Sequence, residues 1–321
     1  MRRFYVFNGD ADGLCALQQL RLIEQGDALL VTGTKRDIEL LKRVNATAGD
    51  EVTVLDISLD RNRAPLLRLL ADGASVRYFD HHYAGELPAH PCLESHIEES
   101  GDVCTSVLVA RYLGEPASSW AIAAAFGDGL PIIATALARS AGLAGETVAT
   151  LERLGTLLNY NAYGDSIRDL RVDPAELARE MQPFNDPLDF ARHSSMFVAL
   201  ADGYEEDMRR ARALEPVRQV PGATMLLLPD APWARRSIGV LANEVMRGQP
   251  ENAVAILAPG THGGFIVSVR VPASRSRSAQ EFCRGYKGGG GRKLAAGIDH
   301  LAEADVDGFM KRFETEFQTE D

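Results

Sequence analysis

Residues 75–82, Ser-Val-Arg-Tyr-Phe-Asp-His-His, join a short run of strand-forming residues to an acidic residue and two histidines. The β-branched and aromatic side chains of residues 75–79 predict a buried strand. Two earlier stretches follow the same pattern, because residues 4–7 precede Asn-Gly-Asp-Ala-Asp-Gly and residues 52–55 precede Asp56. Helix-like segments separate the three runs. The N-terminal part of the chain therefore predicts an α/β fold with a parallel sheet.

The polar side chains that follow these three strands are predicted to meet at one edge of the sheet. Ligand groups collect at the carboxyl ends of the strands in an open parallel sheet. The side chains concerned are those of Asp10, Asp12, Asp56, Asp80, His81 and His82. Asp-Gly and Asp-His pairs also form turns and helix caps. Three such coincidences at successive strand ends favour a metal or catalytic site, since divalent metals take carboxylate and imidazole ligands.

These motifs, as an ordered set, resemble the DHH phosphoesterases. Residues 10–13, Asp56 and residues 80–82 are similar to the first three motifs of that family. Residues 123–129, Ala-Ala-Ala-Phe-Gly-Asp-Gly, resemble its fourth motif, and residues 288–297, Gly-Gly-Gly-Gly-Arg-Lys-Leu-Ala-Ala-Gly, resemble the glycine-rich motif of the DHH-associated C-terminal domain. The resemblance therefore reaches both ends of the chain and implies a parallel-sheet catalytic domain followed by a smaller α/β domain.

The resemblance also implies a pair of divalent cations, typically manganese with magnesium or cobalt as alternatives, that supports hydrolysis of a phosphoester or phosphoanhydride bond. Two such cations can activate a water and stabilise the charge of an in-line displacement. By position in the motifs, Asp10 would serve one cation and Asp56 would bridge both. The other cation would be held by three residues: Asp12, His81 and Asp128.

Two further residues of the third motif are expected to act in catalysis together with the bridging Asp56. His82 would face the substrate phosphate, and Asp80 would orient the imidazoles. The sequence leaves open whether His82 is a general acid or an electrostatic partner. Many members of the family carry a metal-binding histidine just before the first acidic pair, whereas Asn8 stands nearby here. Its amide oxygen could replace that ligand with weaker binding.

A basic segment near the C-terminus predicts a site for an anion. Residues 268–297 contain one acidic residue and seven basic ones, although the chain as a whole has 34 basic and 45 acidic residues and a formal net charge of −11. The basic residues are Arg270, Arg275, Arg277, Arg284, Lys287, Arg292 and Lys293. Such an island on an anionic protein indicates an anionic ligand.

The expected substrate-binding residues lie in and beside the glycine run of this segment. Gly289, Gly290 and Gly291 would let backbone N–H groups approach a phosphate, with a flexible loop as the alternative. Arg292 stands where the family motif usually has histidine, and we expect it to bind phosphate rather than to transfer protons. Arg270 ends a β-like run and resembles the substrate-gripping arginine of the family, so we expect it to contact a nucleotide.

The chain is predicted to form two domains. Residues 1–205 would form the catalytic domain with a helical extension, residues 206–220 a linker, and residues 221–321 the substrate-binding domain with its glycine-rich loop. Short apolar runs at residues 224–228 and 253–257 are consistent with strands of that second domain. The 321 residues, with 45% hydrophobic and 25% charged content, suffice for two cores.

The sequence also favours a cytoplasmic protein without a membrane partner. The four cysteines have no C-x-x-C spacing and are expected to be buried thiols. The apolar run after Arg2-Arg3 is too short for a secretory signal, and no uninterrupted apolar segment is long enough to span a bilayer.

The reaction that we expect is hydrolysis of short oligoribonucleotides or linear dinucleotides, such as pGpG, to mononucleotides, as in the nano-RNase branch that this two-domain chain resembles. A second domain can hold a remote part of the substrate and so position the reacting phosphate. Net negative charge and an aromatic content of 7% disfavour long nucleic acids. The alternatives are a cyclic dinucleotide or 3′-phosphonucleotide phosphatase, a polyphosphatase and a nucleotide-sensing module. The sequence leaves the preferred substrate, the metal and a homodimer open.

Overall fold

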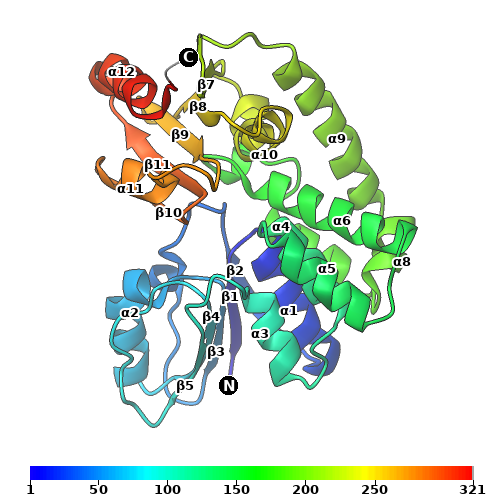
Figure 1. The fold of residues 1–321 in the computed structure, drawn as a ribbon. Coiled ribbons are helices and arrows are strands. Elements are labelled where there is room, and N and C mark those ends of the chain that lie inside the picture. The colour runs from blue at the N-terminus through cyan, green and yellow to red at the C-terminus, as the bar shows by residue number, and fades with distance from the viewer. Residues whose placement is uncertain (320–321) are drawn as a thin grey trace. The chain divides into compact units, whose positions relative to one another are not determined.

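The computed structural model describes residues 1–319, which divide into two compact units (Figure 1). Unit 1 comprises residues 1–162 and 170–202, and unit 2 comprises residues 163–169 together with the chain from Gly203 onward. The division at Gly203 falls inside helix α9 (Ser195–Arg212). The end of α9 and strand β6 (Arg218–Val220) occupy much of the segment predicted as a linker.

Unit 1 is built on a five-stranded, fully parallel sheet with the order β2-β1-β3-β4-β5. The strands are β1 (Arg3–Phe7), β2 (Leu29–Thr32), β3 (Glu51–Leu55), β4 (Ser75–Asp80) and β5 (Leu93–Ile97). The three strands predicted from the sequence are the three central ones, which confirms the parallel α/β fold. Sequence reasoning missed the edge strands β2 and β5, because their partly exposed residues form no buried apolar run.

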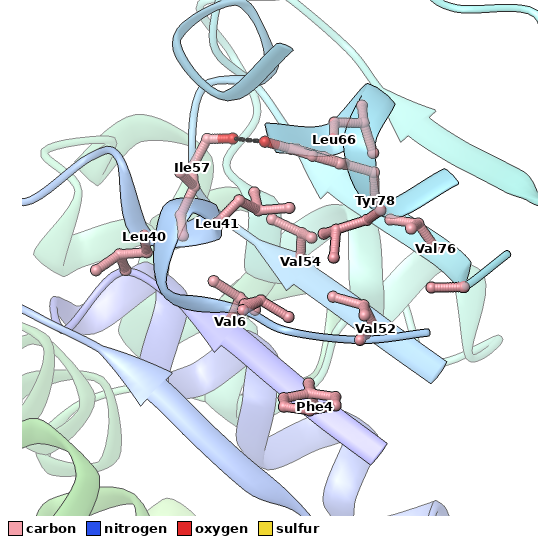
Figure 2. Packing of buried hydrophobic residues seen from close by; sticks show 14 of the residues in the cluster. Phe4, Val6, Leu40, Leu41, Val52, Val54, Ile57, Leu66, Val76 and Tyr78 are labelled. Atoms are coloured by element: carbon pink, nitrogen blue, oxygen red, sulfur yellow. Dashed lines mark hydrogen bonds between the residues drawn. The ribbon is translucent and has the colours of Figure 1, made fainter. Parts of the chain in front are cut away.

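The two faces of this sheet are covered by different helices (Figure 1). Helix α2 (Leu59–Ala71) and the 3-10 turn η1 (Leu40–Arg43) cover one face, and helices α1 (Ala11–Ile23) and α3 (Thr105–Tyr112) lie on the other. Figure 2 shows the first of these cores, in which alternate strand residues meet aliphatic side chains of η1 and α2. Its central members are Phe4, Val6, Leu40, Leu41, Val52, Val54, Leu66, Val76 and Tyr78.

The rest of unit 1 is mainly helical. Its helices are α4 (Ser119–Gly127), α5 (Pro131–Ser140), α6 (Glu146–Ala162), α7 (Pro174–Met181) and α8 (Pro187–His193). Helices α4 and α6 approach each other closely at two glycines. A Cβ atom at Gly127 would lie 2.6 Å from the carbonyl oxygen of Gly155, and one at Gly155 would lie 2.0 Å from that of Ala123. Only glycine permits this approach. The close packing fixes the C-terminal end of α4, where Asp128 lies.

Unit 2 contains a six-stranded mixed sheet with the order β10-β11-β9-β8-β7-β6, in which β7 and β8 are parallel and the other neighbours antiparallel. Besides β6, its strands are β7 (Ala223–Leu227), β8 (Ala253–Pro259), β9 (Phe265–Arg270), β10 (Gly289–Gly291) and β11 (Ala295–Leu301). Its remaining helical elements are η2 (Ile167–Asp169), α10 (Pro232–Gly248), α11 (Ala279–Arg284), η3 (Glu303–Asp305) and α12 (Val306–Phe317). Strands β7, β8 and β9 confirm that the apolar runs in this part of the sequence form strands.

The segment predicted as a glycine-rich loop forms the edge strand β10 of unit 2. It pairs antiparallel with β11, where Gly291 lies opposite Ala296. A Cβ atom at Gly289 would lie 1.8 Å from the carbonyl oxygen of Cys283, and Gly291 has a φ of +137°. Gly289 and Gly291 are therefore required for close packing of the strand, whereas a Cβ atom at Gly290 would meet no other atom within 4 Å.

The four cysteines are free thiols, as expected, and three of them, Cys15, Cys104 and Cys283, are buried. Cys92 is partly exposed. No helix within residues 1–319 is both long and apolar enough to cross a membrane.

A buried hydrogen bond beneath the end of β3 yields a first prediction. The Tyr78 hydroxyl donates to the carbonyl oxygen of Ile57 at 2.6 Å (Figure 2). The change Tyr78→Phe leaves that buried carbonyl without its partner, and we expect it to lower the free energy of unfolding by about 1–3 kcal/mol. Urea unfolding measures this loss. Tyr83→Phe is the control, because Tyr83 is exposed. Equal stability of the two variants would contradict the prediction.

Candidate metal centre

The first acidic pair is positioned by the turn from β1 into α1. Asp10 caps the helix, since its Oδ1 accepts hydrogen bonds from the backbone N–H groups of Asp12 and Gly13 at 3.0 and 3.1 Å. A Cβ atom at position 13 would lie 2.1 Å from the carbonyl oxygen of Asn8. Glycine at that position therefore permits the tight turn, which brings Asp10 and Asp12 to the carboxyl end of β1.

Asp56, which directly follows β3, is held in a left-handed backbone conformation. Its φ of 58° is the only positive value at a non-glycine residue among residues 1–319. Aspartate and asparagine tolerate this region better than most residues. The backbone N–H of Asp56 donates to the carbonyl oxygen of Phe79 at 3.1 Å, so the neighbouring strand holds the turn in place. Such conformations cluster at functional sites.

Asp80 organises the two histidines that follow β4. Its Oδ1 accepts hydrogen bonds from the backbone N–H groups of His81 and His82 and contacts Nδ1 of His82 at 2.7 Å. Nδ1 of His81 lies 2.9 Å from the carbonyl oxygen of Val103. Because a carbonyl only accepts, this nitrogen carries the proton and donates. Nε2 of His81 is thereby oriented as a metal ligand requires.

Nε2 of His81 is the point at which the carboxylates converge. It lies 3.3 Å from Oδ1 of Asp56, 3.8 Å from Oδ2 of Asp128 and 3.9 Å from Oδ2 of Asp12. Asp12, His81 and Asp128 each offer a ligand atom within 4.8 Å of the others, and so do Asp56, His81 and His82. The structure thus brings together side chains from the ends of β1, β3, β4 and α4, in the arrangement that the order of the motifs predicts.

Burial and mutual repulsion set the protonation of this cluster. Burial raises the pKa of Asp12 and that of Asp56, and nearby carboxylates raise both further. Burial alone would lower the pKa of His81, but its hydrogen bond to Asp56 and the charges around it outweigh burial and raise that pKa to about 10. His81 therefore retains its proton at neutral pH. A donor set of buried carboxylates and one imidazole fits a divalent cation, whose charge would replace that proton.

Asp10 has a different electrostatic partner, which sequence reasoning did not identify. Its Oδ2 pairs with Nζ of Lys35. Burial would raise the pKa of Asp10, but the charge and hydrogen bond of Lys35 outweigh it and lower that pKa. Oδ1 of Asn8, the amide oxygen expected to serve a metal, is buried without a hydrogen-bond partner among the described residues. Lys35 lies after β2, outside every recognisable motif, so no local signal marks it.

The predicted substrate-binding residues all lie in unit 2. Arg270 is buried, and its guanidinium donates to Oδ1 of Asn243 at 2.6 Å and to Oγ of Ser268 at 3.0 Å. Burial lowers its pKa. Arg292 is exposed just after the glycines of β10, and its backbone N–H donates to the carbonyl oxygen of Ala295 at 2.8 Å.

Solved structures of three other proteins are similar to this chain over 98% of its length. RecJ from Thermus thermophilus, in complex with Mn²⁺, is 20% identical with a TM-score of 0.67, and the match covers 51% of the RecJ chain. The pGpG-specific phosphodiesterase PggH from Vibrio cholerae is 17% identical with a TM-score of 0.54 over 98% of its chain. An exopolyphosphatase-related protein from Bacteroides fragilis is 13% identical with a TM-score of 0.53 over 91% of its chain.

These likenesses show the fold, in which a parallel-sheet domain precedes a mixed-sheet domain. The chain spans about half the length of the RecJ chain that it matches. No protein-family model and no curated protein sequence matches the chain.

The protonation of the cluster predicts how metal binding depends on pH. A cation that binds here must displace the proton of His81, whose pKa is raised to about 10. Fewer protons remain as the pH rises, so we expect the affinity for Mn²⁺ to increase between pH 6.5 and 8.5, by up to about tenfold per pH unit for each proton released. Titration calorimetry in two buffers of different ionisation enthalpy measures both affinity and proton release. An affinity that stays constant or falls would contradict this expectation.

Proposed function

We propose, from the fold of the DHH phosphoesterases that this chain has, that the protein is a divalent-metal-dependent phosphodiesterase. Its substrates would be short oligoribonucleotides or linear dinucleotides such as pGpG, which it would hydrolyse to mononucleotides. The observation that carries the proposal is the buried convergence of Asp12, Asp56 and Asp128 on Nε2 of His81. Clustered carboxylates and imidazole with perturbed pKa values are typical of catalytic metal sites.

In this proposal Asp12, Asp56, His81 and Asp128 hold the divalent cation, for which we favour manganese. When bound, such a cation supplies Lewis-acid chemistry to the phosphate and to a water. The backbone N–H groups of Thr105 and Ser106, at the start of α3, each donate to one oxygen of Asp12 at 2.7 Å. These bonds orient the carboxylate before any ligand arrives, which is the task of outer-shell partners.

His82 would act on the substrate phosphate. Its side chain is 46% exposed, in contrast to the buried His81, and its Nδ1 contacts Asp80. This contact fixes the ring and leaves Nε2 for the substrate, where an imidazole can donate a proton to a leaving oxygen or stabilise its charge. Asp80 would thus be a positioning residue.

The choice of a short substrate rests on two observations. The chain matches a pGpG-specific phosphodiesterase along 98% of both chains, whereas it covers half of a RecJ chain. The basic segment of unit 2 also suits an anionic ligand. Arg292 and the glycines Gly289, Gly290 and Gly291 would bind the remote part of the substrate. Arg270 is the weaker of the proposed nucleotide contacts, because its guanidinium already donates within unit 2.

A substrate panel with purified protein and Mn²⁺ tests the proposal. The panel contains pGpG, a longer RNA, a cyclic dinucleotide, a 3′-phosphonucleotide and inorganic polyphosphate, and chromatography measures the products. We expect GMP from pGpG to form fastest. Preferred turnover of polyphosphate or of the cyclic dinucleotide would contradict the substrate assignment. Tight pGpG binding without turnover under any divalent metal would favour the nucleotide-sensing module.

The change Asp56→Asn tests the role of the central carboxylate. Asparagine tolerates the left-handed backbone at this position, so the variant removes charge without adding backbone strain. We expect its turnover to fall by more than about 100-fold, which exceeds the usual effect of changing an outer-shell partner.

The matched control for this change is Asp60→Asn in the first turn of α2, where the carboxylate is 47% exposed. That variant should keep its turnover. Full activity of Asp56→Asn would show that Asp56 is not a metal ligand.

A further inference from the structure

Both oxygens of the Asp10 carboxylate contact groups of the protein. Its Oδ1 caps α1 through two backbone N–H groups, and its Oδ2 pairs with the ammonium group of Lys35. The side chain of Asp10 is 2% exposed. The oxygen that the helix cap leaves for a cation is therefore already paired with a positive charge, although the resemblance to the DHH phosphoesterases assigns a divalent cation to this residue.

The ammonium group of Lys35 is held by residues from several elements. Besides Asp10, its Nζ lies 3.2 Å from Oδ1 of Asn159 on α6 and 3.9 Å from Oδ1 of Asp128 at the end of α4. The backbone N–H of Lys35 donates to the carbonyl oxygen of Ala162 at 2.9 Å. The side chain is 26% exposed, so it is lodged in the centre instead of extending into solvent.

The ammonium group of Lys35 lies where the surrounding carboxylates favour a positive charge. Asp10 and Asp128 are like charges in a buried site, and each raises the free energy of the other's ionised form. Nζ of Lys35 lies against both and offsets this repulsion with a single positive charge. A divalent cation bound to Oδ2 of Asp10 would have to displace this ammonium, because the two positive charges repel each other at such short range.

We propose that Lys35 replaces one of the two divalent cations that the fold implies, so that this centre binds a single divalent cation through Asp12, Asp56, His81 and Asp128. The inference rests on the proposed metal-dependent function and specifies its metal requirement. Lys35 is a positioning residue here, because its ammonium group contacts Asp10 and Asp128 and keeps a second ion away from them. The neutral side chain of Asn8 is consistent with a half of the centre that needs no second divalent charge.

Metal stoichiometry tests this inference without any measurement of activity. The protein is freed of metal with a chelator and titrated with Mn²⁺, and the bound ions are counted by calorimetry and by elemental analysis after equilibrium dialysis. The unchanged protein should bind one ion per chain. Lys35→Met removes the charge but retains most of the stem, releases Oδ2 of Asp10 and should raise the count to two. Lys35→Arg keeps the charge and should remain at one.

Electron paramagnetic resonance provides an independent signature. A single Mn²⁺ gives the six-line signal of an isolated ion, whereas two ions that share a carboxylate are magnetically coupled. We expect the isolated signal for the unchanged protein and Lys35→Arg, and the coupled signal for Lys35→Met. The matched control is Lys42→Met, since Lys42 is exposed and pairs with Glu39 on the surface. It should behave as the unchanged protein does.

The outcomes separate this inference from the proposed function. Two ions in the unchanged protein, or a single ion in correctly folded Lys35→Met, would overturn the role of Lys35 and leave metal dependence intact. If circular dichroism shows that Lys35→Met fails to fold, the count in the unchanged protein decides, because one ion supports the inference and two overturn it. No bound ion in any folded variant would instead overturn the metal-dependent function, and this inference would fall with it.

Discussion

The structure of unit 1 depends on compensation of negative charge that is buried at the edge of a parallel sheet. Asp10, Asp12 and Asp56 are almost fully buried, and Asp128 lies beside them. Isolated buried charges are costly, so each carboxylate needs a partner. Lys35 serves Asp10, backbone N–H groups at the start of α3 serve Asp12, and His81 serves Asp56. A divalent cation would offset the negative charge that these partners leave uncompensated.

The surrounding backbone is built to hold these groups at fixed positions. Asp56 occupies a left-handed conformation, which is maintained by the hydrogen bond from its N–H to Phe79 and by the bond between Tyr78 and Ile57. The glycines at positions 127 and 155 bring α4 and α6 close enough together to fix Asp128 and Asn159 on the same side of the centre. Conformational freedom is thus removed at the site before a ligand binds, and less of it is lost on binding.

Much of the catalytic unit can be predicted from the sequence because its signals are local. The buried runs of β1, β3 and β4 and the acidic or histidine residues after them are adjacent in the chain, so the convergence of Asp12, Asp56 and His81 follows from the geometry of parallel sheets. Lys35 and Asn159 could not be identified in this way, because they reach the site from segments without a motif. The glycine run was predicted as a loop, because glycines carry no apolar pattern that indicates a strand, and its pairing with β11 becomes visible only in the structure.

The central claim, that this cluster of side chains is a binding site for a divalent cation, is tested most directly by anomalous X-ray diffraction from crystals soaked in Mn²⁺. The account predicts an anomalous peak within bonding distance of Asp12, Asp56, His81 and Asp128. The electron-density map from the same crystals should show continuous density for the side chain of Lys35 next to Asp10. A map without an anomalous peak between these residues, from crystals in which their side chains are ordered, would contradict it.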